Sequence, residues 1–426
     1  MKFDRRQFLM AGASVAAISM ISRPAWAQDN SLRVAWWGGK ERADRTQKAL
    51  DAYAKTANLT ISTEYLGWGD YWARLTTETS GGNSPDIVQM DIEYLADYAS
   101  RGVLMPLESY MPKPLDTSDF QADLLANGQV GGKQYAVPCG VNAVAMIINK
   151  AAYDEAGVPV PGHDTTWDEF AANAAEFTKK TKRSGMFGTP DASGAEPVLE
   201  TWLRQRGKQL YNVDGSLGYD GKDMTDWFQM WDDMRKSGAA ATAEVQALDH
   251  GDIDNNLLAQ DRAALAFENS NQFVGMQALK TDPMVLAPYP KLGAAGKGGL
   301  YIKPTMFWSI SSQSKKAEAA ATLLDYLLRD PEGTAALGVE RGIPASASVR
   351  DALSKNLDQG SEVMLKYIAD LGDLAGALPP ANPAGGGEVT DALLKASQEV
   401  AFGSTSPTDA GPAYITTVEA ILAGAK

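Results

Sequence analysis

The segment Tyr135-Ala-Val-Pro-Cys-Gly-Val-Asn-Ala-Val-Ala-Met-Ile-Ile-Asn-Lys150 decides how the whole chain is interpreted. It is apolar and rich in β-forming residues, but Pro138 and Gly140 interrupt it. Because proline cannot donate to a strand ladder and glycine weakens a strand interior, we predict two short strands joined by an extended crossover. A short helix over 151–156 is expected to follow. The segment is therefore predicted to be a hinge, where the chain leaves one lobe and starts another.

Alternating strand and helix patterns precede this hinge. Strands are expected over 31–37, 59–65 and 86–90, and helices over 40–57, 69–79 and 91–100. This alternation is typical of an open parallel sheet, in which ligands bind at the carboxyl ends of the strands. Beyond the hinge, helical patterns dominate, and the apolar segment 305–310 is a candidate return crossover.

Residues 1–27 have the features of an export signal. A basic start leads to an apolar run over 9–21 and then to Ala25-Trp26-Ala27, a typical cleavage site. Asp4-Arg-Arg-Gln-Phe-Leu-Met10 resembles a twin-arginine signal; the alternative is an ordinary secretory signal in which two arginines are adjacent by chance. We predict a periplasmic protein whose mature chain starts near Gln28.

The charge and the rare residues exclude several classes of protein. The formal charge is −14, and because residues 1–27 contribute +3, the rest of the chain carries about −17. So acidic a protein is a poor partner for nucleic acid or an anionic membrane. Cys139 is the only cysteine, so no intrachain disulfide can form, and two histidines argue against a dedicated zinc or copper site. We expect no metal and no cofactor.

Several short motifs, in this order, resemble those of the extracellular solute-binding family 1, the maltose-binding-like periplasmic carbohydrate-binding proteins of ABC transporters. Together they extend over nearly all of residues 30–426. The motifs are Asn-Ser-Pro-Asp-Ile-Val at 83–88, Gly-Gly-Lys-Gln-Tyr-Ala-Val-Pro at 131–138, Asn-Lys at 149–150, Thr-Trp-Asp-Glu-Phe at 166–170, Gln-Asp-Arg-Ala-Ala-Leu at 260–265 and Arg-Gly-Ile-Pro at 341–344.

The resemblance implies a fold, a function and partners. The fold would be α/β, a two-lobed periplasmic-binding-protein fold (type II), with open mixed sheets flanked by helices and the ligand in the interlobe cleft. One lobe would comprise 28–138 plus about 281–310, and the other 139–280 plus about 311–426. The protein would be a monomeric binder, not an enzyme, that closes on a sugar, polyol or small glycoside. It would then deliver this ligand to an ABC transporter permease, touching the membrane complex only peripherally.

Thirteen residues are candidate ligand contacts. A sugar offers apolar C–H faces to aromatic rings and hydroxyl groups to polar side chains. Trp37 and Trp68 are the strongest aromatic candidates, because each stands next to glycine at a predicted strand end, although core packing is the alternative for any tryptophan. The candidates are Trp37, Gly39, Lys40, Trp68, Asp91, Glu93, Asn142, Asp191, Ser193, Asn269, Ser270, Trp308 and Arg341.

Most polar candidates have an equally simple structural role. Lys40 could be a solvated lysine, Asp91 and Asn269 could cap helices, and Asn142 could make a structural hydrogen bond. Arg341 could form an ion pair with a neighbouring carboxylate. An anionic solute would use Lys40 or Arg341, or helix N-termini.

Two further sequence features bear on ligand and activity. Residues 379–387 lack the aromatic residue that several oligosaccharide-binding members of the family place there, which favours a mono- or disaccharide or a small glycoside. Residues 252–256 have the alternating oxygens of a calcium loop but lack its glycine and glutamate. No Gly-x-Ser-x-Gly motif is present. A secreted carbohydrate-active enzyme with two catalytic carboxylates is the alternative hypothesis.

Overall fold

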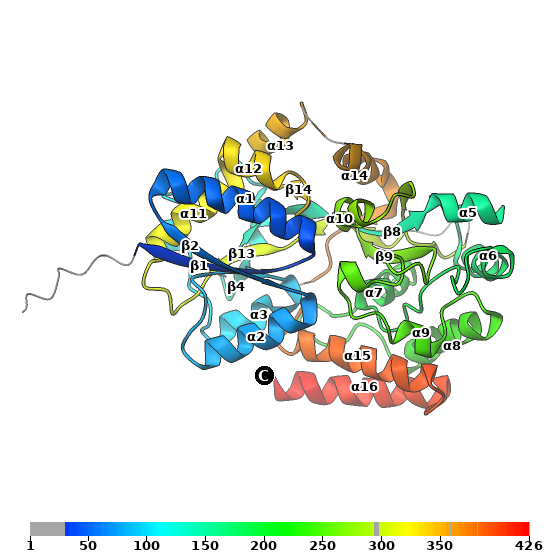
Figure 1. Cartoon of the computed structure of the whole chain (residues 1–426). Helices are drawn as coiled ribbons and strands as arrows, with labels where there is room; N and C mark the ends of the chain where they lie inside the picture. Colours follow the sequence, from blue (N-terminus) through cyan, green and yellow to red (C-terminus); the bar gives the residue numbers. More distant parts are fainter. Residues whose placement is uncertain (1–29, 294–297, 356, 358, 381, 426) are drawn as a thin grey trace, which may run out of the picture.

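The computed structural model describes residues 30–425 apart from 294–297, 356, 358 and 381. The predicted export signal in residues 1–27 lies outside the described residues. The described chain forms two α/β lobes side by side (Figure 1). The predicted fold class is confirmed: each lobe has an open sheet flanked by helices.

The first lobe is built on a five-stranded mixed sheet in the order β2-β1-β3-β13-β6. Strands β2 and β3 are parallel to β1, whereas β13 is antiparallel to both β3 and β6. The strands are β1 (Ser31–Trp37), β2 (Thr60–Leu66), β3 (Ile87–Met90), β6 (Val137–Pro138) and β13 (Phe307–Ile310). The helices are α1 (Lys40–Ala57), α2 (Trp68–Ser80), α3 (Ile92–Ser100), α4 (Ala122–Ala126), α11 (Ala317–Arg329) and α12 (Pro331–Leu337). The three predicted strand-helix units are confirmed to within about one residue.

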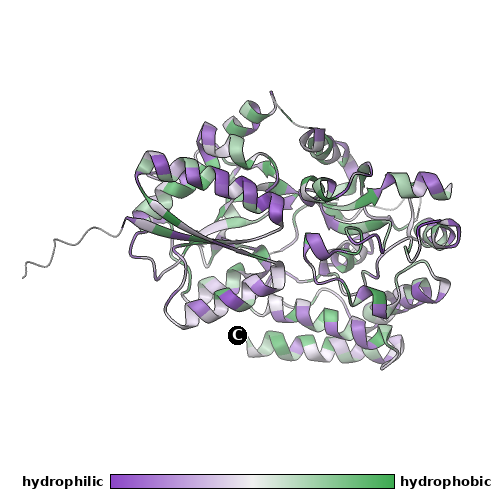
Figure 2. Cartoon of the chain, in the orientation of Figure 1, coloured by the Kyte–Doolittle hydropathy of each residue, from purple (hydrophilic) through white to green (hydrophobic). Residues whose placement is uncertain are grey.

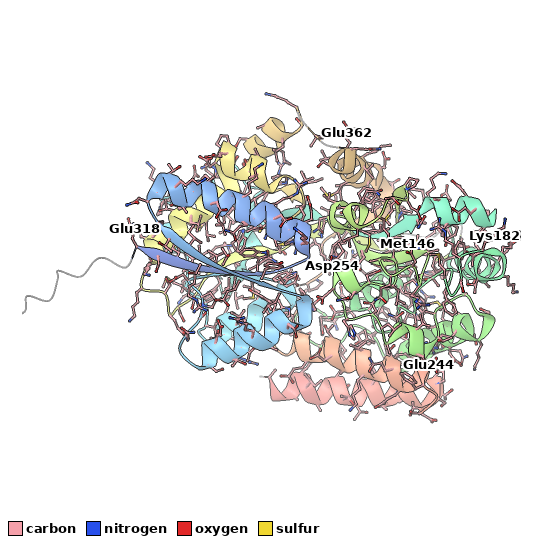
Figure 3. All side chains as sticks on the ribbon, in the orientation of Figure 1. Met146, Lys182, Glu244, Asp254, Glu318 and Glu362 are labelled. Atoms are coloured by element: carbon pink, nitrogen blue, oxygen red, sulfur yellow. The ribbon has the colours of Figure 1, made fainter. Side chains whose placement is uncertain are left out.

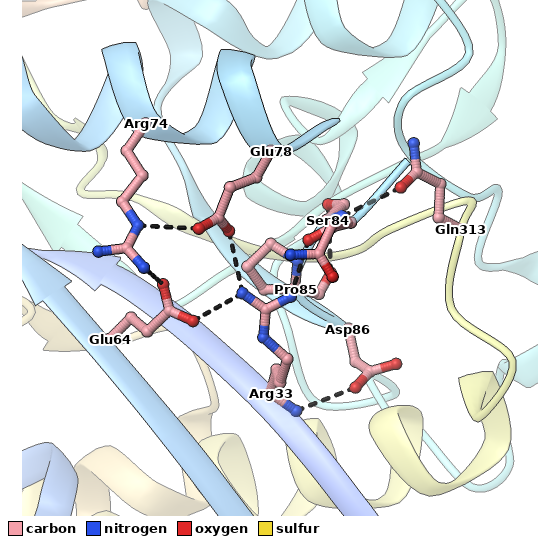
Figure 4. Close-up of polar contacts among 9 residues, drawn as sticks. Arg33, Glu64, Arg74, Glu78, Ser84, Pro85, Asp86 and Gln313 are labelled. Carbon is pink, nitrogen blue, oxygen red and sulfur yellow. Dashed lines mark hydrogen bonds and ion pairs between the residues drawn. The ribbon is translucent and has the colours of Figure 1, made fainter. Parts of the chain in front are cut away.

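A polar network fastens the end of this sheet that lies away from the cleft (Figure 4). The Asp86 carboxylate accepts hydrogen bonds from the backbone N–H of Arg33 at 2.9 Å and from the Ser314 hydroxyl at 2.6 Å. The Arg33 guanidinium lies between Glu64 and Glu78, at 2.7 and 3.0 Å. The Pro-Asp motif therefore ties β1 and β3 to the segment before α11, which is a structural role.

The second lobe has a three-stranded antiparallel sheet in the order β10-β8-β9. Its strands are β8 (Val144–Asn149), β9 (Leu265–Asn269) and β10 (Met284–Ala287). Its helices are α5 (Lys150–Ala156), α6 (Trp167–Lys180), α7 (Glu196–Gln205), α8 (Gly221–Ser237), α9 (Ala243–Gln246), α10 (Gln272–Leu279), α14 (Gln359–Asp370), α15 (Gly386–Ala401) and α16 (Pro407–Gly424). A large core of aromatic and aliphatic side chains fills the space between sheet and helices. Hydropathy follows this layering, with apolar strands and polar outer helix faces (Figure 2).

Three crossings of the chain form a small antiparallel sheet between the lobes. Strand β7 (Gly140–Asn142) lies between β12 (Lys303–Pro304) and β14 (Ile343–Pro344). The predicted interruption and crossover in residues 135–150 are confirmed, as the short strands β6 and β7 followed by β8. A Cβ at Gly140 would approach the Ile343 carbonyl oxygen to 2.5 Å, so glycine is required for these crossings to pack closely.

The predicted lobe boundaries were wrong in the middle of the chain. Residues 281–310 were expected in the first lobe, but β10 pairs with β8 in the second. Residues from 311 were expected in the second lobe, but α11 and α12 pack in the core of the first, against the helix α1. The chain crosses at β12 and again at β14, rather than near 281 and 311. The apolar segment 305–310 lies mostly in β13, just after its crossing, and the crossing at β14 was not predicted.

The C-terminal helices join the two lobes along one side of the molecule. Helices α15 and α16 pack on α8 of the second lobe, and α15 also contacts α3 of the first (Figure 1). At this contact a Cβ on Gly387 would collide with the ring of Tyr94, at 2.6 Å. The small residues near 385–387 thus allow α15 to approach the first lobe. None of the helices in the described part of the chain is both long and apolar enough to cross a membrane.

Candidate ligand-binding cleft

A cavity of about 1180 Å³ lies between the two lobes. The first lobe contributes the ends of β1, β2 and β3 and the helices that follow them. The second lobe contributes the loop before α7, the loop over 249–256, and the end of β9. The crossing β12 and one face of α15 complete the lining. As predicted for parallel strands, the carboxyl ends of the first sheet point at this cavity.

The lobes touch directly at one rim of the cavity. The backbone N–H of Trp68 donates to the Asp252 carboxylate across the gap at 2.6 Å. A Cβ on Gly67 would overlap that carboxylate, and one on Gly39 would lie 2.6 Å from Ile253. The glycines that follow β1 and β2 therefore permit the second lobe to come this close. Figure 3 shows Asp254, of the same loop, between the lobes.

An aromatic wall lines the first-lobe side of the cleft. It consists of Trp37, Trp68, Trp72 and Tyr94. Trp72 stacks on Tyr94 with ring centroids 4.0 Å apart, and Trp68 meets Trp72 edge-on at 5.4 Å. Trp37 lies 5.1 Å from Trp68 and 5.4 Å from Trp72. These rings pack against one another and hold one another in position, so the surface is already formed before a ligand binds.

Carboxylates from both lobes lie beside the aromatic wall. Asp91 caps α3 by accepting from the Glu93 backbone N–H at 3.0 Å, and Glu93 follows on the first turn. Glu196 begins α7 in the second lobe and accepts a hydrogen bond from the Thr390 hydroxyl. Burial raises the pKa of Asp91, and burial together with the nearby Glu196 raises that of Glu93 well above its usual value. Burial likewise raises the pKa of Glu196 to about 7.

A second polar group lies at the end of β9. The Glu268 carboxylate accepts from the Asn256 side-chain amide at 2.7 Å. Burial, reinforced by the charge of Asp249, raises the pKa of Glu268 to about 8. Lys303, on the crossing β12, also lines the cavity, and its charge lowers the pKa of the carboxylates around it. The cleft thus combines aromatic faces with many hydrogen-bond acceptors.

Seven of the predicted contacts line the cavity and six do not. The seven are Trp37, Gly39, Trp68, Asp91, Glu93, Asp191 and Asn269. The six are Lys40, Asn142, Ser193, Ser270, Trp308 and Arg341, none of which is in the lining. Asp91 has the predicted capping role in addition to its place in the cleft, and Asp191 lines the cavity while bound to Arg235 at 2.5 Å.

The two cations expected to hold an anionic solute lie outside the cavity lining. Lys40 is the first residue of α1, and its side chain points to solvent. It forms an ion pair with Asp44, one helical turn later, at 2.5 Å. Arg341 is buried, its Nε donates to the Gln89 side chain at 3.0 Å, and its guanidinium lies 5.2 Å from the ring centre of Trp308. Trp308 lies in β13 within the first-lobe core, and Arg341 just precedes the crossing β14.

The remaining three candidates outside the lining have structural hydrogen bonds. The Asn142 amide donates to Asn271 at 2.7 Å, which ties the hinge strand to the start of α10. The Ser270 hydroxyl accepts from the Ala143 backbone N–H at 3.3 Å. Ser193 is buried, and its hydroxyl bonds to Ser397. These polar side chains satisfy buried groups near the lobe junctions instead of facing the cavity.

Sequence reasoning missed five important lining residues, namely Trp72, Tyr94, Glu196, Glu268 and Lys303. A signal for Trp72 was present, because it follows Trp68 by one helical turn and so shares its face. Glu196 lies in the same segment as the candidates Asp191 and Ser193, so its position in the sequence also offered a signal. Glu268 and Lys303 depend on the position of β9 and β12, which only the pairing of distant strands reveals. Among the described residues, no group of three or more His, Cys, Asp or Glu is placed to hold a metal ion.

Comparison with known proteins agrees with this architecture. A family model described as bacterial extracellular solute-binding protein matches residues 48–364. A solved family 1 extracellular solute-binding protein from Alicyclobacillus acidocaldarius is 29% identical, with a TM-score of 0.62, over 92% of this chain and 98% of that one.

Two sugar-binding proteins are also similar to this chain. A periplasmic oligogalacturonide binding protein from Yersinia enterocolitica, solved with saturated digalacturonic acid, is 24% identical with a TM-score of 0.83, over 93% of this chain and 99% of that one. The arabinooligosaccharide-binding protein of Halalkalibacterium halodurans is 24% identical over 158 residues, 36% of this chain and 34% of that protein. With the two lobes, the crossings between them and the cleft that they line, the family match leads to one conclusion: this chain belongs to the bacterial extracellular solute-binding protein family.

Proposed function

We propose that the protein captures a sugar or small glycoside in the interlobe cleft and delivers it to the permease of an ABC importer. The observation that carries this proposal is the aromatic wall of Trp37, Trp68, Trp72 and Tyr94 beside buried carboxylates in one cavity. Aromatic faces cover the C–H surface of a sugar, while carboxylates accept from its hydroxyl groups. The sugar ligands named for the Yersinia and Halalkalibacterium relatives support the same ligand class.

Closure is the physical step that binding controls. A solute that touches Trp68 on one lobe and Glu196 on the other favours the closed state by its differential affinity. The three hinge strands are short, so the change in backbone angles falls on a few residues around β7. The protein is monomeric and periplasmic in this proposal, exported by residues 1–27, and it binds its solute without converting it.

The decisive experiment combines thermal stability with small-angle scattering. The purified protein is screened against neutral mono- and disaccharides, polyols, amino sugars and sugar acids. A ligand present at 100 times its Kd adds about 2.7 kcal/mol of stability, which a melting curve detects easily. The same ligand is expected to reduce the radius of gyration. A bound sugar that leaves the scattering profile unchanged, or that is converted to products, would contradict the proposal, and conversion would support the glycosidase alternative.

A further inference from the structure

The lining of the cleft has a large excess of carboxyl groups over lysine and arginine side chains. Nine of its carboxylates have no ion-pair partner among the residues that the structure describes. They include Asp91, Glu93, Glu196, Asp252 and Glu268. A cleft for a neutral sugar needs a few acceptors, but nothing in that function requires so many acidic groups around one cavity of about 1180 Å³.

Basic side chains in the lining do little to balance this charge. Arg42 is held by Glu340 in a buried ion pair at 2.9 Å. Arg101 is exposed and lies 4.0 Å from Asp97. Of the lysines and arginines in the described lining, this leaves Lys303, whose single charge faces several carboxylates.

Closure brings like charges from the two lobes together. Glu93 belongs to the first lobe and Glu196 to the second, and each lines the same cavity. The Glu196 charge is, after burial, the largest cause of the raised pKa of Glu93. Repulsion between two carboxylates disfavours the state that brings them together, unless a positive charge lies between them. A cationic group on the ligand would therefore add to the preference for the closed form.

The aromatic wall lies next to these carboxylates. Tyr94 directly follows Glu93. Besides burial, the charges of Glu93, Asp391 and Glu196 raise the pKa of the Tyr94 hydroxyl. The Tyr94 ring stacks on Trp72. Aromatic faces attract cations as well as the apolar faces of sugar rings. The same corner of the cleft can thus hold a sugar ring and an ammonium group attached to it.

We infer that the cleft selects a carbohydrate that carries a protonated amino group, such as a short oligosaccharide of amino sugars or an aminated glycoside, over sugar acids. This inference rests on the proposed function and names the substrate class of the same site. A uronate would place its carboxylate among acidic groups, and Lys303 is the one lysine or arginine of the described lining that forms no ion pair. Lys40 and Arg341, which could have served an anion, lie outside the cavity.

Three disaccharides test the charge directly by calorimetry near neutral pH. They are the disaccharide of β-1,4-linked glucosamine, its N,N′-diacetylated form and digalacturonic acid. The first two share a backbone and differ in the charge that acetylation removes. We expect the aminated disaccharide to bind at least about tenfold more tightly than the acetylated one, with an affinity that falls as salt rises, and digalacturonic acid to bind most weakly.

Matched variants assign the effect to the carboxylates. Glu93→Gln and Glu196→Gln keep the shape of the side chain and remove its charge. Each is expected to reduce affinity for the aminated disaccharide about tenfold more than it reduces affinity for the acetylated one. Glu332→Gln, on the exposed start of α12, is the control and should change neither. Melting curves without ligand verify that every variant is folded.

The possible results separate this inference from the proposed function. Tighter binding of the acetylated or acidic disaccharide overturns the inference and leaves a solute-binding protein. Equal loss of both aminated and acetylated ligands in Glu93→Gln and Glu196→Gln also overturns it, because the carboxylates would then serve as ordinary hydrogen-bond acceptors. If none of the three disaccharides binds while another sugar closes the lobes, the inference fails alone. If no carbohydrate closes the lobes, both fail.

Discussion

The face of the cleft contributed by the first lobe carries all of the tryptophans in the described lining, whereas the face contributed by the second lobe combines loops with one side of α15 and has many polar side chains. Trp37, Trp68 and Trp72 are part of the first-lobe core or pack against it. Glu196, Glu268 and the loop over 249–256 reach the cavity from the second lobe. The first-lobe face thus carries the aromatic platform together with Asp91 and Glu93, and the second-lobe face brings further charge and hydrogen bonds to it on closure.

This difference shows which part of ligand recognition each lobe provides. A packed aromatic surface loses little conformational entropy when it binds, so it suits a general affinity for sugar rings. Polar groups on the opposite lobe distinguish one solute from another and make binding depend on closure. Substitutions on the platform should therefore affect stability and affinity together, whereas substitutions on the opposite face should affect charge dependence and closure.

The largest expected effect is at Trp37, the centre of the platform. Trp37 is only 7% exposed and contacts the rings of Trp68, Tyr71 and Trp72. Trp37→Ala would leave a cavity in the core and lower the free energy of unfolding by about 3–5 kcal/mol. Urea denaturation measures this value. Unchanged stability would mean that the platform is not braced by its neighbours.

On the second-lobe face, Glu268 should make the free energy of unfolding depend on pH. The pKa of Glu268 is raised from 4.5 to about 8 in the folded protein, so folding favours its protonated form. Its contribution is fully present below about pH 4.5 and is lost as the pH rises through 8. The Glu268→Gln variant has no carboxyl group at this position to ionise. As the pH rises from 4.5 to 8, its free energy of unfolding should therefore increase by roughly 2–4 kcal/mol relative to that of the wild type.

Denaturation of both proteins at several pH values provides the test. Glu332→Gln, at an exposed carboxylate, is the control and should follow the wild type at every pH. A constant difference between Glu268→Gln and the wild type would show that the Glu268 carboxylate titrates normally.

Trp68 should separate affinity from stability. It is partly exposed to the cavity, unlike Trp37, and its ring meets Trp72 edge-on. Trp68→Ala is expected to weaken ligand binding by about 1–3 kcal/mol, with a smaller loss of stability than Trp37→Ala. Titration calorimetry with any sugar found in the screen measures the loss. Wild-type affinity would remove this ring from the binding surface.

The smallest effect is expected where the two faces touch. The Asp252 carboxylate accepts from the Trp68 backbone N–H at 2.6 Å, across the gap between the lobes. Asp252→Ala removes this contact from the closed state alone, which should cost that state about 1 kcal/mol. Distances between spin labels on the two lobes report the closed population with and without ligand. Should the variant close as readily as the wild type, this contact contributes nothing to closure.

Local patterns in the sequence were enough for the elements and for part of the platform. The alternation of strands and helices up to Ser100, and the broken strand at Pro138 and Gly140, depend on neighbouring residues and were predicted closely. Trp37 and Trp68 were found because a tryptophan beside glycine at a strand end has a simple geometric meaning in a parallel sheet. Asp91 was found because it follows the carboxyl end of the third predicted strand.

Pairings between distant segments could not be predicted in this way. The assignment of 284–287 to the second lobe depends on pairing with β8, and that of α11 and α12 depends on packing against α1. Arg341 is withdrawn from the cleft because Gln89 on β3, far away in sequence, accepts its hydrogen bond. Lys303 joined the cleft because β12 pairs with β7.

By itself, the sequence determined the order of strands and helices, the first hinge strand and the aromatic character of the first-lobe binding face, since each follows from the spacing of nearby residues. Tertiary structure alone decided where the lobes divide, which carboxylates meet across the cleft and which cations are withdrawn from it. The physical reason is that charge balance in a cavity is a property of side chains brought together from separate parts of the chain, and no local pattern records which of them will become neighbours.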